Sequence, residues 1–567
     1  MRNKTKLATM AIVLCVGQAM VENAQAQQKG WGEKEGKLEE AVINVEKNVA
    51  VELPEAPRNF EKFRIDPPQP AKDDVTYRFT DYKMPGQEVD VNMRVLTIKQ
   101  DDLPKLLGNY VKLGFGNYAT PYLKGYFHNT RSKDYSIGAD VSHISSANGP
   151  VERGGENISG VSNSSVGLHG ESFQRNMTLG GRLHYGHDRY KFYGFSPAIE
   201  QFSEDSIQQV FNRVTAEGYL NNYQDSRAKL QYQAGVNFSL LKDNFEASET
   251  NFGVNLKTDY FLDKISKISV KTDFAYASHK DSVTNTRPFF KISPTYQRDM
   301  DKLDIEIGAT IGYTGDTIND ARKFNFYPVV KASYEVVEGK VLFFAGLEGD
   351  LQRNTLYKLT EENPYLAPNV IVADINKNLD VNAGISLNLA NNVHLLGKVS
   401  YRNYRNLYFF NNSVTDSSKF AIWYDNGSTS AVNVYADLAY TMAEKFRFGT
   451  KIDYTNYSTE TLDHPYHRPS MWASVYSTFN LYNKILLNAE LYYISSSFGS
   501  IYRPQTGIFV DQETDNIVDL NLKGDYRFSN KFSAFLMFNN LFGNKYERIV
   551  NYPTKGINVI GGISYSF

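Results

Sequence analysis

The sequence of 567 residues predicts an all-β protein, a 22-stranded antiparallel transmembrane β-barrel with a short, mostly irregular N-terminal periplasmic arm. Three observations predict this fold. Aromatic residues are abundant (39 Tyr, 35 Phe, 3 Trp), glycine is frequent (40), and only 41% of residues are apolar, which is typical of twisted, amphipathic strands. Long segments alternate apolar and polar residues with a period of two. The connections between these segments alternate between short and long, as in outer-membrane barrels.

The composition also excludes several classes of protein. No segment beyond residue 26 has about 18 consecutive apolar residues, so membrane-spanning helices are not expected. A net charge of −2 without a basic cluster argues against nucleic-acid binding, and the single cysteine excludes a disulfide scaffold. Catalytic motifs such as a P-loop or H-E-x-x-H are absent from the sequence. We therefore expect no enzyme, no catalytic or metal-binding residues and no cofactor.

Two histidines are the best candidates in the sequence for a metal site. His464 and His467 lie in a long polar connection, separated by Pro465. Proline prevents the helix that would fix the spacing of two ligands. The sequence therefore favours a structural role for both histidines.

Residues 1–26 predict a secretory signal peptide. The segment begins with positive charges, continues with an apolar core at 7–14 and ends in the small-residue site AQA at 24–26. The apolar core is too short to span a bilayer. Cys15 follows a leucine, which is too large for a lipidation signal, so cleavage is expected to remove the only cysteine. Export of an aromatic-rich, cysteine-free chain indicates the outer membrane of a Gram-negative cell.

Residues 27–109 predict a periplasmic arm without regular structure. Proline blocks helix interiors and central strands. The arm contains seven prolines, at positions 54, 57, 67, 68, 70, 85 and 104. We expect a mostly extended segment, partly disordered near 30–36.

Residues 110–567 predict the barrel itself. Residues 518–528 show the period best, because Val518, Leu520 and Leu522 fall on one face and Asp519, Asn521 and Lys523 on the other. The apolar face suits lipid and the polar face suits a wet lumen. Charged residues of two such segments are expected on the lumen wall: Arg447, Lys451, Asp453, Lys523, Asp525 and Arg527.

The connections give the strand count. Short polar turns are predicted near 131–134, 174–176, 224–227, 263–267, 298–302, 338–340, 390–393, 443–445, 482–484 and 529–531. On the opposite side, connections are predicted near 117 and 243 and at about 147–164, 196–206, 279–287, 314–323, 352–377, 406–430, 456–470, 498–516 and 543–556. Eleven hairpins joined by ten turns make 22 strands, and both ends of the barrel then lie on the periplasmic side.

The last predicted strand, 556–567, ends in an aromatic residue. Ile563, Tyr565 and Phe567 stand at alternate positions on its apolar face. This pattern is typical of the C-terminal signal that the outer-membrane barrel assembly machinery recognises. We therefore expect these three residues to direct insertion.

Local motifs resemble the TonB-dependent receptor family. The stretch 540–546 (NLFGNKY) is similar to a motif near the end of that family's barrel, followed by Tyr552-Pro553 and the final SYSF. The stretch 363–369 (NPYLAPN) is similar to a loop motif of the family, except that Asn369 replaces the usual glutamate. The resemblance covers about 110–567. It implies a 22-stranded barrel and says little about the ligand.

The N-terminal region departs from the family pattern. Residues 27–109 are too few for the plug domain that these receptors carry. Within them, Glu40, Ala41, Val42, Ile43, Asn44 and Val45 are similar to a TonB box, which would pair with TonB as an added strand. An ordinary short β segment accounts for the same residues and is favoured, because the motif is degenerate and no plug is expected.

Two functions fit these predictions. The first is a barrel that binds or transports a solute across the outer membrane. The alternative is a plug-less scaffold that acts with surface lipoprotein or periplasmic partners. The expected partners are outer-membrane lipid and the barrel assembly machinery, together with TonB, a surface lipoprotein or a periplasmic plugging protein. Because a wide barrel must be filled, we expect the arm, the loops at 147–164, 352–377 and 406–430, or another protein to occupy the lumen.

Overall fold

The computed structural model describes residues 107–129, 132–153, 156–194, 206–223, 228–316, 318, 322–390 and 392–567. The predicted signal peptide, nearly all of the predicted arm and the TonB-box-like stretch therefore lie outside the described residues. No helix in the described ranges is long and apolar enough to cross a membrane.

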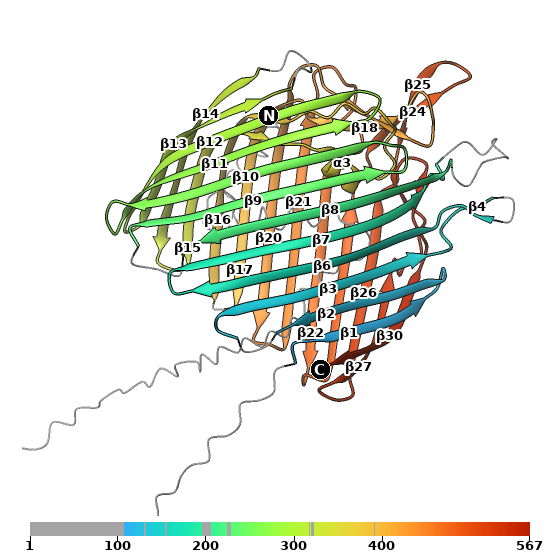
Figure 1. Cartoon of the computed structure of the whole chain (residues 1–567), viewed down its shortest axis with the longest axis horizontal. Coiled ribbons are helices and arrows are strands. Elements are labelled where there is room, and N and C mark those ends of the chain that lie inside the picture. The colour runs from blue at the N-terminus through green and yellow to red at the C-terminus, as the bar shows by residue number, and fades with distance from the viewer. Residues whose placement is uncertain are drawn as a thin grey trace, which may run out of the picture. The chain divides into compact units, whose positions relative to one another are not determined.

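The described chain forms a single 22-stranded antiparallel sheet closed into a barrel (Figure 1). Each strand pairs with the barrel strand that follows it in the sequence, and β1 pairs with β30 over seven residues to close the cylinder. The predicted fold class and strand number are confirmed.

The strands alternate in direction. Those that run from the periplasmic to the extracellular end are β1 (Tyr110–Gly116), β3 (Tyr135–Ser146), β7 (Met177–Lys191), β9 (Leu230–Asp243), β11 (Ser266–Lys280), β13 (Leu303–Thr314), β15 (Val341–Gln352), β17 (Val393–Arg405), β21 (Phe446–Ser458), β23 (Ile485–Ile494) and β27 (Phe532–Asn539). Those that run from the extracellular to the periplasmic end are β2 (Thr120–His128), β6 (Val161–Gln174), β8 (Gln208–Asn221), β10 (Ser248–Phe261), β12 (Thr284–Met300), β14 (Phe324–Val337), β16 (Ile375–Ala390), β20 (Thr429–Met442), β22 (Met471–Leu481), β26 (Ile517–Arg527) and β30 (Asn558–Ser566).

The connections lie where the sequence predicts them. All ten periplasmic turns separate the expected strands, and the eleven connections at the other end carry most of the remaining chain. One connection is shorter than predicted. The sequence predicts a loop at 279–287, whereas β11 and β12 extend into this range and only 281–283 joins them. The other difference is that four loops contain short hairpins of their own and one contains a helix. These elements are β4 (Glu152–Arg153) with β5 (Glu156–Asn157), α3 (Leu356–Glu362), β18 (Tyr408–Asn412) with β19 (Phe420–Tyr424), β24 (Phe498–Arg503) with β25 (Ile508–Glu513), and β28 (Glu547–Ile549) with β29 (Tyr552–Pro553).

The two faces of the barrel wall differ as a membrane requires. In β13, the side chains of Ile307 and Ile311 are 53% and 43% exposed on the outside, whereas Thr310 is buried on the inside. Exposed aromatic side chains gather near both ends of the strands, as in aromatic girdles at the two membrane interfaces. Examples are Tyr185, Phe252, Tyr276, Phe326 and Tyr454 at the loop end, and Tyr260, Tyr296, Tyr334, Phe479 and Tyr526 at the turn end.

The two faces predict different costs for an added charge. Ile307→Arg places a guanidinium against lipid in the middle of β13, which should destabilise the barrel by about 2–4 kcal/mol. Glu306→Arg, on the neighbouring inward position, should cost about 1 kcal/mol or less because the lumen is hydrated. Urea unfolding in lipid vesicles, followed by the shift in gel mobility on heating, measures both. Equal costs for the two variants would mean that the orientation of β13 is wrong.

Candidate functional site

The loops at the extracellular end pack together over the barrel mouth. We call the segments 353–374, 406–428, 459–470 and 540–557 the loop cap, because each contributes to one hydrophobic cluster. The cap residues of this cluster are Leu356, Leu359, Leu366, Val372, Leu407, Tyr408, Phe409, Phe410, Phe420, Tyr466 and Tyr552. Tyr190, Phe211 and Leu241, on the neighbouring wall strands β7, β8 and β9, belong to the same cluster. The cap is therefore packed onto the inner wall and is part of the folded core.

A buried carboxylate on the wall holds the helix of the cap. Glu249 on β10 is fully buried, and its two oxygens accept the N–H groups of Leu356 (2.8 Å) and Tyr357 (3.1 Å). These donors belong to the first turn of α3, where backbone N–H groups have no partner within the helix. Thr355 caps the same turn by accepting from the N–H of Lys358. The partial positive charge of these groups stabilises the anion, which also accepts from the side-chain amide of Asn251 (2.9 Å).

An arginine on β12 fixes both ends of the same loop. Arg287 donates to Asp316 (2.5 Å), to Asp374 (2.5 Å) and to the backbone carbonyl of Asn354 (2.8 Å). Asp374 also accepts from the hydroxyl of Thr314. All four side chains involved in these bonds are buried in the described structure. Because Asn354 and Asp374 flank the loop, one guanidinium ties its start to its end.

A further pair of residues joins three cap segments. Arg468 donates to the carbonyl of Tyr408 (2.8 Å) and lies over the rings of Tyr408 and Phe409. His467 bonds the carbonyl of Phe410 through Nδ1 (2.7 Å) and accepts the N–H of Val550 at Nε2 (3.3 Å). These partners require a neutral imidazole with its proton on Nδ1. Burial of the ring lowers the pKa of His467 to about 4, which favours this neutral form.

Stacked tyrosines fill the centre of the cap. The ring of Tyr552 stacks on that of Tyr365 with centroids 3.8 Å apart, and lies 4.7 Å from the ring of Tyr193. Its hydroxyl donates to the carbonyl of Ser418. Gly194 faces this ring so closely that a Cβ there would lie 2.4 Å from Tyr552 Cε2. The aromatic cluster therefore links the loop after β7 to three cap segments.

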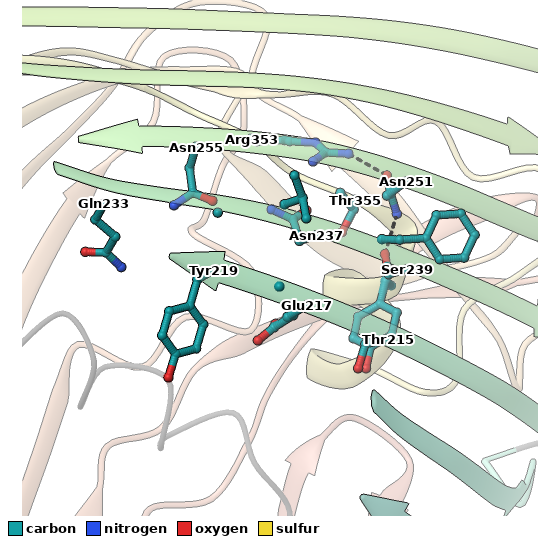
Figure 2. Close-up of a pocket in the computed structure, with 15 residues that line it drawn as sticks. Thr215, Glu217, Tyr219, Gln233, Asn237, Ser239, Asn251, Asn255, Arg353 and Thr355 are labelled. Carbon is teal, nitrogen blue, oxygen red and sulfur yellow. Dashed lines mark hydrogen bonds between the residues drawn. The ribbon is translucent and has the colours of Figure 1, made fainter. Parts of the chain in front are cut away.

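A polar cavity lies against the wall beside α3 (Figure 2). It has a volume of about 450 Å³ and is bounded by β8, β9, β10 and the first residues of the loop 353–374. Its polar lining consists of Thr215, Glu217, Tyr219, Gln233, Asn237, Ser239, Asn251, Asn255, Arg353, Thr355 and Tyr357. Figure 2 shows Asn251 bonded to both Arg353 and Ser239, at distances of 2.6 and 3.2 Å. Its size is within the usual range of small-molecule sites.

The six charged residues predicted for the lumen wall do not form one site. Lys451 and Arg447 both lie over the ring of Tyr476, and Asp453 accepts from Asn433. Around the barrel from them, Lys523 and Asp525 are buried beside one another. Lys112 on β1 reaches Asp525 at 3.2 Å. Arg527 lies near the turn end, where it meets the carbonyl of Asn483 at 3.5 Å. A common role in the lumen stays a prediction.

The other predicted residues lie at the barrel seam or outside the described chain. Ile563 is exposed on the outer face of β30, and the ring of Tyr565 contacts those of Phe532 and Phe567. The backbone of Phe567 pairs with Asn109 at the start of the barrel. Their role as an insertion signal remains a prediction. The TonB-box-like residues at 40–45 are not described.

The histidines at 464 and 467 are occupied by structural contacts. His464 stacks on Phe498 with ring centroids 3.9 Å apart, while His467 is bonded to two backbone groups. Within the described ranges, no group of three or more His, Cys, Asp or Glu side chains has the arrangement of a metal site.

Sequence reasoning missed the cavity and the anchors of the cap. The alternation of apolar and polar residues in 230–240 and 252–262 predicts a strand in each segment, with Asn237 and Asn255 on the polar faces. It carries no signal that residues 353–357, which are about 100 positions away in the chain, return to this wall.

The Arg287 anchor yields a testable prediction. Arg287→Leu leaves Asp316 and Asp374 buried without their cation, which should destabilise the loop 353–374 by about 3–5 kcal/mol. Cleavage of this loop by proteinase K in intact outer membranes should accelerate about 100-fold or more. Arg405→Leu removes an exposed charge at the same end of the barrel and serves as the control. Wild-type cleavage rates in Arg287→Leu would contradict the anchor.

The neutral His467 predicts a pH dependence of the cap. Its pKa is about 4 in the folded protein and about 6.5 in an unfolded chain, so the unfolded state takes up the proton first. The contribution of His467 to the free energy of unfolding of the cap is complete above pH 6.5. It falls by at most about 1.4 kcal/mol per pH unit as the pH drops toward 4. The protection factors of the amides in 406–412 and 546–550, which are the exchange rates corrected for the intrinsic pH dependence of exchange, should therefore decrease below pH 6.5.

His467→Asn is the matched control for this experiment. Asparagine tolerates the left-handed backbone that His467 adopts (φ 54°) and does not titrate. The acid-induced decrease of the protection factors should be smaller in this variant. An identical pH profile in wild type and His467→Asn would assign the effect to another group.

Comparison with known proteins identifies the fold. No family model and no curated protein matches the sequence. Among solved structures, the FrpB iron transporter from Neisseria meningitidis (F3-3 variant) matches with a TM-score of 0.63 and 10% identity over 82% of each chain. The siderophore receptor PirA from Acinetobacter baumannii matches with a TM-score of 0.62 and 9% identity over 82% of this chain and 81% of that one.

The ferric enterobactin receptor PfeA from Pseudomonas aeruginosa, as a point mutant in complex with enterobactin, matches with a TM-score of 0.60 and 10% identity over 81% of each chain. The names of these structures describe transporters and receptors rather than enzymes. At such identities the likeness concerns the fold alone. The chain therefore has the fold of the TonB-dependent receptor barrel that its sequence motifs predict.

Proposed function

We propose that this protein is an outer-membrane barrel for the uptake of a polar solute, with the loop cap as its extracellular gate. One observation carries the proposal: a polar cavity lies on the inner wall directly beside the helix that is anchored in the cap. A solute that passes the cap enters a hydrated space lined with groups that can hold it. The neighbouring structures, two of which are named for siderophores or enterobactin and one for iron, support a transport role in general terms.

The nature of the cap explains how such a barrel avoids leaking. A 22-stranded barrel is wide enough to need an obstruction. The segments 353–374 and 406–428 lie within the loops 352–377 and 406–430 that the sequence offers for filling the lumen, and they supply most of the cap residues of the hydrophobic cluster. Their anchors are buried charges, and displacing the loops would expose those charges to water, where ions are well solvated. A gate of this kind stays shut at rest and still has a stable open form.

The energy for opening would come from a partner. TonB is the partner that the stretch 40–45 would recruit as an added strand, and that engagement is part of the proposal. We infer no role for a bound metal or cofactor.

The gate can be tested by electrical conductance. The purified wild-type barrel should show little conductance in planar bilayers, because the cap closes its mouth. Replacing residues 355–373 by a short Gly-Ser linker should open a stable pore and make cells sensitive to large antibiotics. The same linker in place of 504–507, in the hairpin β24–β25, leaves the hydrophobic cluster intact and should change nothing. A wide pore in the wild type, or a closed barrel after removal of 355–373, would contradict the proposed function.

A further inference from the structure

Three cations face outward at the extracellular end of neighbouring strands. Arg189 on β7, Lys242 on β9 and Lys280 on β11 are exposed, and the residue before each of them in the chain is buried on the inner face. Because successive side chains of a strand point to opposite faces, these three point away from the lumen. The strands β7 to β11 pair in sequence order, so the three share one side of the outer wall (Figure 1). We call them the cationic patch.

The cationic patch keeps a net positive charge in the described part of the protein. None of its three side chains forms an ion pair or a hydrogen bond there. Asp188 is taken by Arg213 on the inner face. Two other carboxylates lie nearby: Asp281, which accepts the N–H of Asn369, and Glu246, which forms no ion pair with a described residue. The residues directly opposite the three cations on adjacent strands are uncharged: Ser162, Val210, Asn212, Ser248 and Thr284.

Each cation of the patch stands at the same interval beyond the aromatic girdle. Four residues before it on the outer face of the same strand lies an exposed aromatic side chain, namely Tyr185, Phe238 or Tyr276. Such aromatic residues mark the boundary of the hydrocarbon. Four residues of a strand tilted by about 40° rise about 10 Å along the membrane normal. The patch therefore lies in the layer of polar lipid headgroups, where long cationic side chains reach phosphates.

This arrangement belongs to one side of the barrel. On β21, the residue four positions beyond the exposed Tyr454 is Ser458. On β17, Arg405 follows Tyr401 at the same interval, but the residue opposite it on β16 is Asn376. A general attraction to anionic lipid does not require three cations gathered on β7, β9 and β11, so the patch indicates a particular lipid.

The surroundings of the patch favour a phosphorylated glycolipid. The neutral polar side chains of Asn212, Ser248 and Thr284 stand beside the cations and can bond sugar hydroxyls. Toward the middle of the membrane the same wall exposes Leu183 and Val236, which suit acyl chains. Free phosphate would meet the cations but would gain nothing from this apolar wall.

We propose that the cationic patch binds lipopolysaccharide, the phosphorylated glycolipid of the outer leaflet in Gram-negative cells. Its phosphates contact Arg189, Lys242 and Lys280, its sugars contact the neutral polar residues, and its acyl chains cover the outer wall below. The site lies on the lipid face of the barrel, so it does not depend on the cavity or on the loop cap.

The experiment measures binding of lipid A to the full-length protein in detergent by native mass spectrometry. The wild type should bind bisphosphorylated lipid A about tenfold more tightly than dephosphorylated lipid A, as expected for three exposed ion pairs. The triple variant Arg189→Gln, Lys242→Gln, Lys280→Gln should lose this preference. Its barrel should still show the heat-dependent gel mobility of the wild type, because the three side chains contact no described residue through a polar bond.

The matched control removes the same charge outside the patch. Arg175→Gln, Lys445→Gln, Arg503→Gln changes three exposed cations in turns and in the hairpin β24–β25, and should retain the tenfold preference. The inference is overturned if the wild type shows no preference, if the patch variant keeps it or if the control loses it equally. Phosphatidylglycerol that binds as tightly as lipid A would reduce the patch to a site for any anionic lipid. Displacement of lipid A by millimolar inorganic phosphate would assign the patch to a soluble anion, and both results would contradict the proposal.

Discussion

In the hydrocarbon of a bilayer a backbone N–H or C=O has no water to bond, so every such group must find a partner within the protein. The pairing of β1 with β30 meets this requirement, because it removes the two free edges that an open sheet would present. All other features follow from this closure. The strands must alternate apolar and polar side chains, and their number leaves a lumen wide enough to need an obstruction. The obstruction in turn must be fixed to the wall.

The fixing of the cap uses buried charge in two different ways. At Glu249 the counter-charge comes from backbone N–H groups of α3, so the helix and its anchor are specified together. At Arg287 two carboxylates and a carbonyl surround one guanidinium. Breaking either arrangement is unfavourable in free energy, because a buried charge without its partner is neither hydrated nor paired. The hydrophobic cluster contributes buried apolar surface, whereas these polar anchors determine the positions of the loops on the wall.

The fold could be predicted from sequence because the barrel repeats one local rule. The alternation in 518–528 and the spacing of polar turns fix the faces and the number of strands without knowledge of distant contacts. No comparable local pattern predicts the contacts of the cap. Its contacts join Leu356 to Glu249 and His467 to Val550, which are separated by about a hundred residues in each case, and a period of two carries no information about them. Likewise, the sequence pointed to charged wall residues such as Lys523, whereas the cavity lies on β8, β9 and β10 and is completed by Arg353.

The central claim is that the loop cap is as firmly folded as the barrel that it closes. Hydrogen exchange of the native protein in lipid measures this directly, residue by residue. Amides of α3 and β18 should exchange as slowly as amides in the middle of β9 and β10, over hours or longer, because opening them requires breaking the buried anchors. Exchange of these amides within seconds, while the strands remain protected, would show that the loops only rest on the barrel and would contradict the account.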